Sequence, residues 1–346
     1  MEKTAEAMIT PIQSELSYAV EVFTGIRSTG NLTIGNYLGA VKPIIDLQRQ
    51  GLRPLVFVAD LHALTDREPR DAFKYRKELI GDYLALGLDE EKCDLFIQSD
   101  IADEVFHLMG LLSRHISVAE LMRVPTLKDK LRDTEQPENA NSLLALYPVM
   151  MAADILLQRP RFVPVGADQM AHMEVMRKLA RRFNSQYGEV FPIPEPEQIE
   201  PLRLLGLKGS SKMSKTHPNE AIFLTDTSEE ARKKIKTAQT AFAGEMPEVL
   251  TSHVKLAKGL ASSTEDAALV DEIIKEHLAG KNVMGSFKQV LSRLVCSFLD
   301  SFQKKKREIT ADPQYVASVI ESGVKIARKN AAETLAATVD AMARQQ

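Results

Sequence analysis

Four short apolar runs, each separated by longer stretches of chain, constrain the fold more than any other feature of this sequence. The runs are AVEVFTG, PLVFVADL, CDLFIQSD and RFVPVG, which begin at residues 19, 54, 93 and 161. Helical patterns follow the last three runs, at residues 71–86, 104–114 and 168–183. Strands that alternate with helices in this way are typical of a parallel sheet with crossover helices. We therefore expect an α/β fold.

The length and composition of the chain predict a globular protein with two domains. It has 346 residues, of which 44% are hydrophobic and 26% charged, and this balance is typical of globular proteins. No apolar run approaches the roughly 20 residues that a membrane-spanning helix needs. The start, MEKTAEAMITPIQSE, lacks the apolar segment of a secretory signal. We expect a cytoplasmic protein that does not bind membranes.

The composition changes near residue 205. The segment EPEQIEPLRLLGLKGSSKMSKT, from residue 195, is rich in Pro, Gly, Ser and Lys, and only helical patterns follow it, at residues 228–242, 265–278, 283–306 and 313–343. This predicts a junction near residues 205–225. Residues 132–141, RDTEQPENAN, predict an exposed loop. Residues 281–346 carry 11 Lys or Arg against 6 Asp or Glu, although the whole chain has a net charge of −3. Such a basic end can contact phosphate or can be a solvated helix face, and charge alone does not decide.

A glycine cluster follows the first apolar run. Residues 24–40, TGIRSTGNLTIGNYLGA, contain four of the seventeen glycines of the chain. Glycine lets a ligand approach the backbone, and the N–H groups at a following helix start attract anions. The cluster therefore indicates a nucleotide or phosphate site, or else a tight structural turn. Its spacing matches neither common phosphate-binding motif.

A second cluster, GSSKMSKT at residues 209–216, places two lysines three residues apart in a Gly- and Ser-rich segment. A loop of this kind can bring ammonium groups to a polyphosphate while its negative charge redistributes. Together the two clusters resemble the paired motifs of class I aminoacyl-tRNA synthetases, with Thr33-Ile34-Gly35-Asn36 in place of the HIGH tetrad and Lys212-Met213-Ser214-Lys215-Thr216 in place of KMSKS. The first tetrad position is Thr instead of His, so it can donate one hydrogen bond to a phosphate but carries no positive charge.

Further stretches narrow the resemblance to the tryptophanyl-tRNA synthetases. They are GIRSTGNLTIGNYLGAV, ADLHALT, LFIQSD, LYPVMMAADILL, FVPVGADQMAH and KMSKT, in the order of that family. In FVPVGADQ, Ala167 replaces an acidic residue that is usual in the family. Two other interpretations stay open: a tyrosyl-tRNA synthetase, and a catalytically silent paralogue that binds tryptophan or tRNA as a regulator.

The resemblance implies an enzyme that activates L-tryptophan with ATP and Mg²⁺ and transfers it to the tRNA for tryptophan. It also implies a homodimer with residues 105–148 at the interface. The implied domains are an N-terminal extension (1–18), a Rossmann-like catalytic domain (19–206), the lysine loop and linker (207–225), and an all-helical anticodon-binding domain (226–346). The last helix is expected to pack back on the catalytic domain.

The resemblance also implies roles for individual residues. The implied catalytic residues are Lys212, Lys215, Thr33 and Asn36. The implied ATP contacts are Gly25, Arg27, Gly35, Asn36, Lys130, Gly166, Asp168, Met213 and Ser214, with Lys128 as an alternative to Lys130. The implied tryptophan contacts are Phe23, His62, Tyr147, Met151, Asp154, Val163, Val165 and Gln169. No such support exists for His107, His115 or His172.

Asp154 has the most specific of these roles. Tyr147, Met151 and Asp154 recur at spacings of four and three, which places them on one face of a helix. An Asp on a mostly apolar face is costly without a partner. Either it caps a neighbouring helix or pairs with an arginine, or, as the resemblance implies, it accepts the indole N–H of tryptophan.

Overall fold

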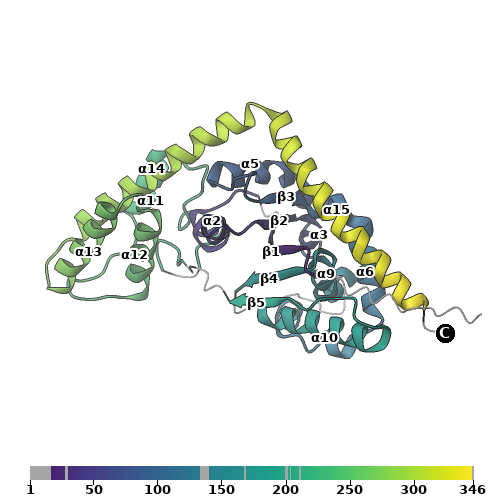
Figure 1. The fold of residues 1–346 in the computed structure, drawn as a ribbon. Helices are drawn as coiled ribbons and strands as arrows, with labels where there is room; N and C mark the ends of the chain where they lie inside the picture. Colours follow the sequence, from purple (N-terminus) through teal and green to yellow (C-terminus); the bar gives the residue numbers. More distant parts are fainter. Residues whose placement is uncertain are drawn as a thin grey trace, which may run out of the picture.

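The computed structural model describes residues 17–27, 30–132, 140–166, 169–198, 202, 204–209 and 212–344. It confirms the α/β fold: five parallel strands lie among helices, and the C-terminal third is helical (Figure 1). Asp168 and most of the loop predicted at 132–141 fall outside the described residues. No helix in the described part of the chain is long and apolar enough to cross a membrane.

The sheet contains one strand more than the sequence predicts. Its strands are β1 (Val20–Arg27), β2 (Pro54–Ala59), β3 (Asp94–Ile97), β4 (Pro160–Val165) and β5 (Glu195–Gln198), in the spatial order β3-β2-β1-β4-β5. The unpredicted strand, β5, is short and polar, with the sequence EPEQ. Because it lies at an edge and pairs only with β4, it needs no apolar run of its own.

The strand order reverses between β1 and β4, and this reversal opens a crevice. The chain runs from β1 outward to β2 and β3, and then returns to place β4 on the other side of β1. β1 pairs with β2 along six positions, from Val22–Pro54 to Arg27–Ala59. It pairs with β4 only at Val20–Pro160 and Val22–Phe162. Beyond these pairs the two strands separate, and parallel α/β sheets bind ligands at the carboxyl ends of strands at such a point.

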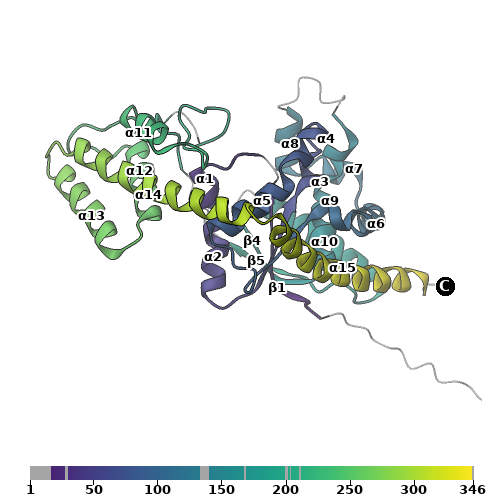
Figure 2. The ribbon, with the colours of Figure 1, turned by 90° about the horizontal axis from the view of Figure 1, so that it is seen from above.

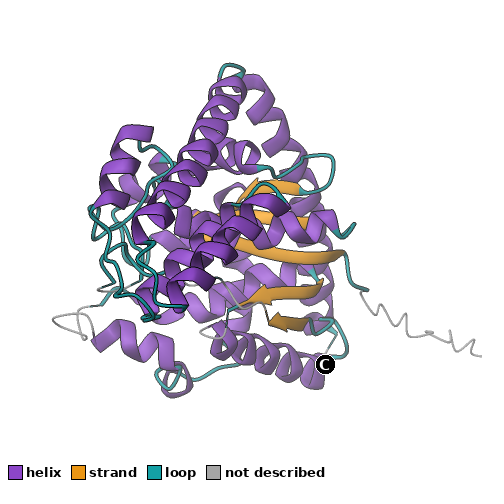
Figure 3. Cartoon of the chain, turned by 90° about the vertical axis from the view of Figure 1, so that its left-hand side faces the viewer, coloured by secondary structure: helices purple, strands orange, loops and turns teal. Residues whose placement is uncertain are grey.

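Both faces of the sheet are covered by helices (Figure 3). One face packs against α1 (Ile34–Asn36), a π-helical turn η1 (Tyr37–Val41), α2 (Lys42–Arg49) and α5 (Arg76–Leu86). The other packs against α6 (Ala102–Ser113), α7 (Val118–Leu121), α8 (Pro125–Arg132), α9 (Ser142–Gln158) and α10 (Met170–Tyr187). Shorter helices α3 (Asp60–Ala63), α4 (Pro69–Lys74) and η2 (Gln98–Ile101) connect the strands. Side chains of β2 alternate between the two apolar clusters, with Val56 and Val58 in the first and Leu55 and Phe57 in the second.

The helical part consists of α11 (Ser228–Lys236), α12 (Glu248–Leu260), α13 (Thr264–Leu278), α14 (Met284–Thr310) and α15 (Pro313–Ala343). Sequence patterns do not predict α12, and they extend α11 to Phe242, which is highly exposed in a loop. Figures 1 and 2 show α14 leading from these helices to the sheet, where the chain turns into α15. At α5, Lys306 of α14 makes ion pairs with Asp82 (2.7 Å) and Glu78 (3.0 Å).

The last helix, α15, lies against β3, α6 and α9. A Cβ atom at Gly323 would come within 2.0 Å of the carbonyl oxygen of Leu95, so only glycine allows the helix to approach β3 this closely. Three contacts hold the rest of the helix to the end of α9: Gln158 donates to the Ala327 carbonyl (3.0 Å), Thr334 donates to the Leu157 carbonyl (2.9 Å), and Arg159 pairs with Glu333 (2.7 Å). The sheet separates the two apolar clusters. Buried residues of α11–α14 belong to the same cluster as those of α1 and α2.

Candidate functional site

The crevice between β1 and β4 holds a cavity of about 610 Å³. Twelve of the residues predicted from the sequence line it: Phe23, Gly25, Arg27, His62, Lys130, Tyr147, Met151, Asp154, Val163, Val165, Gly166 and Gln169. They come from β1, α3, α8, α9, β4 and the start of α10, which are far apart in the sequence. Thus Tyr147, Met151 and Asp154 do share one face of α9, as their spacing predicts.

Asp154 is the most buried charged group of this cavity, with only 3% of the residue exposed. Its Oδ2 lies 2.8 Å from His62 Nε2, which therefore carries the proton and donates. Gln98 Nε2 donates to both carboxylate oxygens, each at 2.9 Å. The partners that a buried carboxylate needs are thus polar groups at the carboxyl ends of β2 and β3. Neither an arginine nor a helix cap is among them.

Apolar side chains form the wall of the cavity around Asp154. Phe23 stacks on Phe57 with ring centroids 4.9 Å apart, while Met151, Val163 and Val165 lie across the cavity. A Cβ atom at Gly25 would lie 2.4 Å from the ring of Phe57. The missing side chain at Gly25 therefore makes room for this ring, a role that the sequence pattern does not predict.

Two cations and a tyrosine lie at the mouth of the cavity. Arg27 pairs with Asp66 (2.6 Å), and the Lys130 ammonium lies 4.5 Å from the centre of the Tyr147 ring. Burial, followed by the charge of Arg27, lowers the pKa of Lys130 from its usual value. The Tyr147 hydroxyl donates to Thr126 (3.1 Å). This region is suited to an anion, because each cation is partly desolvated and would gain from a phosphate or carboxylate.

The Thr-Ile-Gly-Asn tetrad forms the first turn of α1. Thr33 is the N-cap: its hydroxyl accepts from the Asn36 backbone N–H (3.2 Å) and donates to Asn36 Oδ1 (3.0 Å), which also accepts from the Thr33 backbone N–H (2.9 Å). This reciprocal arrangement is a capping box. Both side chains are therefore engaged in starting the helix, and Thr33 would have to release Asn36 before donating to a phosphate.

The lysine loop lies directly against this turn. Met213 is buried, and its Sδ lies 3.5 Å from the position that a Cβ atom would take on Gly35. Lys215 Nζ donates to the Gly30 carbonyl at 2.9 Å. Burial, with the charge of Arg67 as a second cause, lowers the pKa of Lys215 to about 8. Lys212 is exposed, and Ser214 is partly buried with its hydroxyl close to that of Thr216. The structure therefore brings the two motifs together through Gly30, Gly35, Met213 and Lys215.

Several residues outside the predicted set also belong to this region. Phe57, Thr126 and His172 line the cavity, and His172 Nε2 lies 2.8 Å from the Thr126 hydroxyl. Gln98 is not among the lining residues, but it donates to the Asp154 carboxylate. Gln98 could have been found from the sequence, because it follows the apolar run CDLFI just as His62 follows PLVFVADL, at the carboxyl end of a predicted strand.

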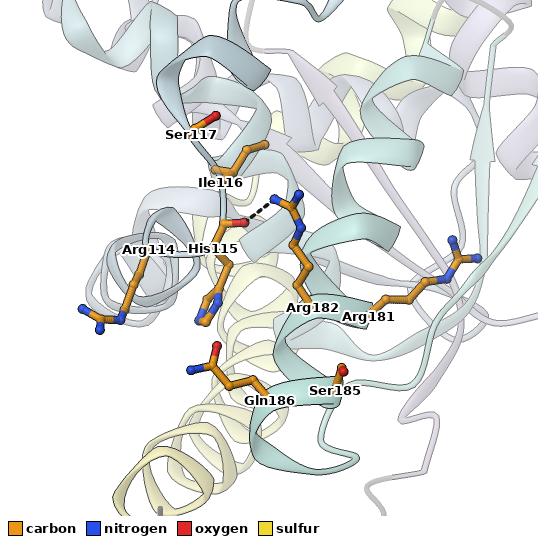
Figure 4. Close-up of a pocket in the computed structure, with 8 residues that line it drawn as sticks. All are labelled: Arg114, His115, Ile116, Ser117, Arg181, Arg182, Ser185 and Gln186. Carbon is orange, nitrogen blue, oxygen red and sulfur yellow. Dashed lines mark hydrogen bonds between the residues drawn. The ribbon is translucent and has the colours of Figure 1, made fainter.

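A second cavity, away from the strand ends, is less suited to chemistry. It lies between α6 and α10 and is lined by Arg114, His115, Ile116, Ser117, Arg181, Arg182, Ser185 and Gln186 (Figure 4). The close-up shows Arg114 and Arg181 pointing in opposite directions, while Arg182 donates to the His115 carbonyl at 2.7 Å. Arg182 also pairs with Glu120. These charges do not converge on one point, so the crevice at the sheet remains the candidate active site.

Comparisons with known proteins identify the family of the chain. The family model described as "tRNA synthetases class I (W and Y)" matches residues 17–300. A tryptophan–tRNA ligase of Porphyromonas gingivalis is 37% identical over 91% of this chain and 96% of its own length. The crystal structure of tryptophanyl-tRNA synthetase from Mycoplasma pneumoniae is 31% identical, with a TM-score of 0.80 over 94% of this chain and 98% of that one.

A second similar structure contains ligands. It is the tryptophanyl-tRNA synthetase of Campylobacter jejuni complexed with ADP and tryptophan, which is 31% identical with a TM-score of 0.78 over 93% of this chain and 99% of that one. With the fold, the cavity and the two adjoining motifs in place, these matches show that the chain belongs to the tryptophanyl-tRNA synthetases, the class I enzymes that ligate tryptophan to tRNA.

Proposed function

We propose that this chain makes tryptophanyl-adenylate and pyrophosphate from L-tryptophan and ATP in the crevice between β1 and β4, and then transfers tryptophan to the terminal ribose of its tRNA. The observation that carries the proposal is the buried carboxylate of Asp154, held by His62 and Gln98 at the end of an apolar cavity. An indole has one polar atom, its N–H donor, on an apolar double ring. A lone acceptor in an apolar wall is complementary to it.

Asp154 would accept the indole N–H. The indole rings would be contacted by Phe23, Tyr147, Met151, Val163 and Val165. Gln169, at the start of α10, would contact the amino group. A phenylalanine in this cavity would leave Asp154 without its partner, and sites built around a hydrogen bond reject such analogues by roughly 10⁴-fold or more. Tyrosine also carries a donor, but its single ring would fill less of the apolar space.

The reaction needs no protein nucleophile. A carboxylate oxygen of tryptophan bonds to the α-phosphorus, the bond from that phosphorus to the β-bridging oxygen breaks, and pyrophosphate leaves. The protein would contribute positioning and charge: Arg27 and Lys130 at the cavity mouth, and Lys212 and Lys215 on the loop. Gly25, Gly35, Asn36, Gly166, Met213 and Ser214 would contact the nucleotide, with Asp168 at the ribose. Thr33 would join them only if it exchanges its bond to Asn36 for one to a phosphate.

Mg²⁺ would enter with ATP. Within the described residues, no group of three or more His, Cys, Asp or Glu is placed to hold a metal ion. Its donors would be chiefly the phosphate oxygens of ATP, which hold Mg²⁺ with a shell of water in many nucleotide enzymes. The ion would neutralise phosphate charge beside the lysines.

We propose that the helical part recognises the tRNA. The chain then divides into a catalytic part (19–206), the lysine loop and linker (207–225) and an anticodon-binding part (226–346). The basic excess of residues 281–346 would contact phosphates, and unpaired bases would give specificity. Protein synthesis places the enzyme in the cytoplasm.

We also propose a symmetric homodimer built on residues 105–148. Phe106, Val118 and Met122 are large apolar side chains of this region that are exposed in the single chain, Val118 by 73%. Large exposed apolar side chains are typical of an interface between copies. Analytical ultracentrifugation should show a dimer at micromolar concentration, and a monomer there would remove this part of the proposal.

The central test is ATP–pyrophosphate exchange that depends on the amino acid. We expect exchange with tryptophan and little with tyrosine or phenylalanine. Exchange with tyrosine in preference to tryptophan would show that the enzyme is specific for tyrosine. Binding of tryptophan without any exchange would instead favour a regulatory role.

A further inference from the structure

Gln98 lies at the carboxyl end of β3, as the first residue of η2, and is completely buried. It belongs to the stretch LFIQSD, which has no role in the reaction described above. Its side chain makes four hydrogen bonds, two through the oxygen and two through the nitrogen. A buried side chain of this kind has one orientation that satisfies all of its partners.

The backbone fixes that orientation. Gln98 Oε1 accepts from the N–H groups of Leu61 (3.1 Å) and His62 (3.3 Å) at the start of α3. The amide nitrogen must then face the opposite way, toward Asp154, where it lies 2.9 Å from each carboxylate oxygen. A flipped amide would place an oxygen against the carboxylate and leave two buried N–H groups facing a donor, which is costly.

A neighbouring network keeps this segment in place. The Ser99 backbone N–H donates to Asp60 Oδ1 (3.0 Å), and its hydroxyl donates to Asp60 Oδ2 (2.6 Å). Arg76 donates to Ser99 (3.0 Å) and to the same Asp60 oxygen (3.3 Å). The ends of β2 and β3 are thus also joined at Ser99, next to Gln98, and this limits movement of the Gln98 amide.

From this geometry we infer that Gln98 is a positioning residue for amino-acid specificity: it holds the Asp154 carboxylate in place, while His62 sets its plane, so that one lone pair faces the indole N–H of tryptophan. This inference rests on the proposed function, in which Asp154 accepts that N–H. The Gln98 nitrogen lies equally far from both carboxylate oxygens and so fixes the direction in which the carboxylate points. His62 contacts one of the two oxygens and so fixes rotation about the Cβ–Cγ bond.

Two substitutions separate positioning from folding. Gln98→Met keeps the length of the side chain and removes the donor. Gln98→Glu keeps an acceptor for the Leu61 and His62 N–H groups and places an oxygen against Asp154. The matched control is Gln158→Met, because Gln158 is equally buried on the same helix as Asp154 but bonds to Ala327 and Asn330 of α15.

Each variant is assayed by pyrophosphate exchange with tryptophan and with its benzothiophene analogue, in which sulfur replaces the indole N–H. Because hydrogen bonds to charged groups are at stake, both Gln98 variants should raise the KM for tryptophan by about ten- to a hundredfold. The KM for the analogue and for ATP should change by less than about threefold, since neither ligand uses the positioned lone pair. Gln158→Met should leave the preference of the enzyme for tryptophan over the analogue unchanged.

The outcomes are distinguishable. An equal loss for tryptophan and the analogue, or no loss for either in a folded Gln98→Met protein, would overturn the positioning role while leaving the proposed function intact. If the unsubstituted enzyme catalyses pyrophosphate exchange equally well with tryptophan and with the analogue, Asp154 does not accept a hydrogen bond from the indole N–H. The proposed site and the role of Gln98 would then both be wrong.

Discussion

The charge of Lys215 should set the alkaline limit of adenylate formation. Its ammonium group donates to the Gly30 carbonyl at 2.9 Å, and burial together with the nearby Arg67 lowers its pKa to about 8. A lysine with a lowered pKa carries its positive charge below that value and loses it as the pH rises through it. If the charge stabilises the phosphates as pyrophosphate leaves, the reaction should slow over the same range.

The size of the effect follows from the pKa. With a value of about 8, Lys215 is about nine-tenths charged at pH 7 and about one-tenth charged at pH 9. The value of kcat/KM for ATP, which reports the enzyme before ATP binds, should therefore fall about tenfold between these pH values. The value of kcat at saturating ATP should fall less, because bound phosphates favour the ammonium form and raise its pKa.

Exchange is measured against pH at saturating tryptophan for the unsubstituted enzyme and three variants. Lys215→Arg keeps its charge throughout this range, so its alkaline fall should disappear. Arg67→Gln removes the second cause of the lowered pKa and should move the fall to higher pH. Lys215→Ala should lower the rate of adenylate formation by about 10² to 10³ with little change in tryptophan affinity, because its charge acts in the transition state. An identical alkaline fall in the unsubstituted and Lys215→Arg enzymes would refute this reasoning.

Three further predictions concern the specificity residue, the last helix and the ligand environment. Asp154→Ala should weaken tryptophan binding and leave ATP binding nearly intact, as measured by calorimetric titration of each ligand. Gly323→Ala should destabilise the protein by about 3 kcal/mol because its methyl group would overlap the Leu95 carbonyl, whereas Gly81→Ala, which has room in α5, should stabilise it by roughly 0.5 kcal/mol in denaturant unfolding. Because the chain contains no tryptophan, tryptophan emission in a titration with protein comes only from the ligand, and it should shift to the blue on binding in the unsubstituted protein but not in Asp154→Ala.

The strands and the two motifs could be predicted because their signals are local. Four of the five strands are apolar runs, and β2 is buried along its whole length, as a continuous apolar run in a parallel sheet requires. β5 could not be found in this way, since EPEQ is polar and owes its extended form to pairing with β4. The end of α11 could not be predicted from the sequence pattern either. The helix ends at Lys236 with Thr237 as its C-cap, although the helical pattern continues to Phe242.

The partners within the site were harder to predict than the site itself. Spacing along α9 places Tyr147, Met151 and Asp154 together. Asp154 and Gln98, however, are 56 positions apart in the sequence, and they meet because α9 packs on the sheet in which β3 ends just before Gln98. Gly25 shows the opposite limitation. Its place in the glycine cluster indicates a ligand site, and the structure adds a second role for the missing side chain, which leaves room for the ring of Phe57.

The two kinds of charged group in the site differ in how firmly they are held, and this difference divides their roles. Asp154 is buried and accepts from two side chains that are themselves fixed to the ends of β2 and β3. Lys215 donates to the neutral carbonyl of Gly30, and a phosphate oxygen is a stronger acceptor for an ammonium group than a carbonyl is. The carboxylate can therefore select the amino acid without moving, while the lysine exchanges its carbonyl for phosphate as ATP binds. Changes around Asp154 should then alter the KM for tryptophan, and changes in the loop should alter the rate.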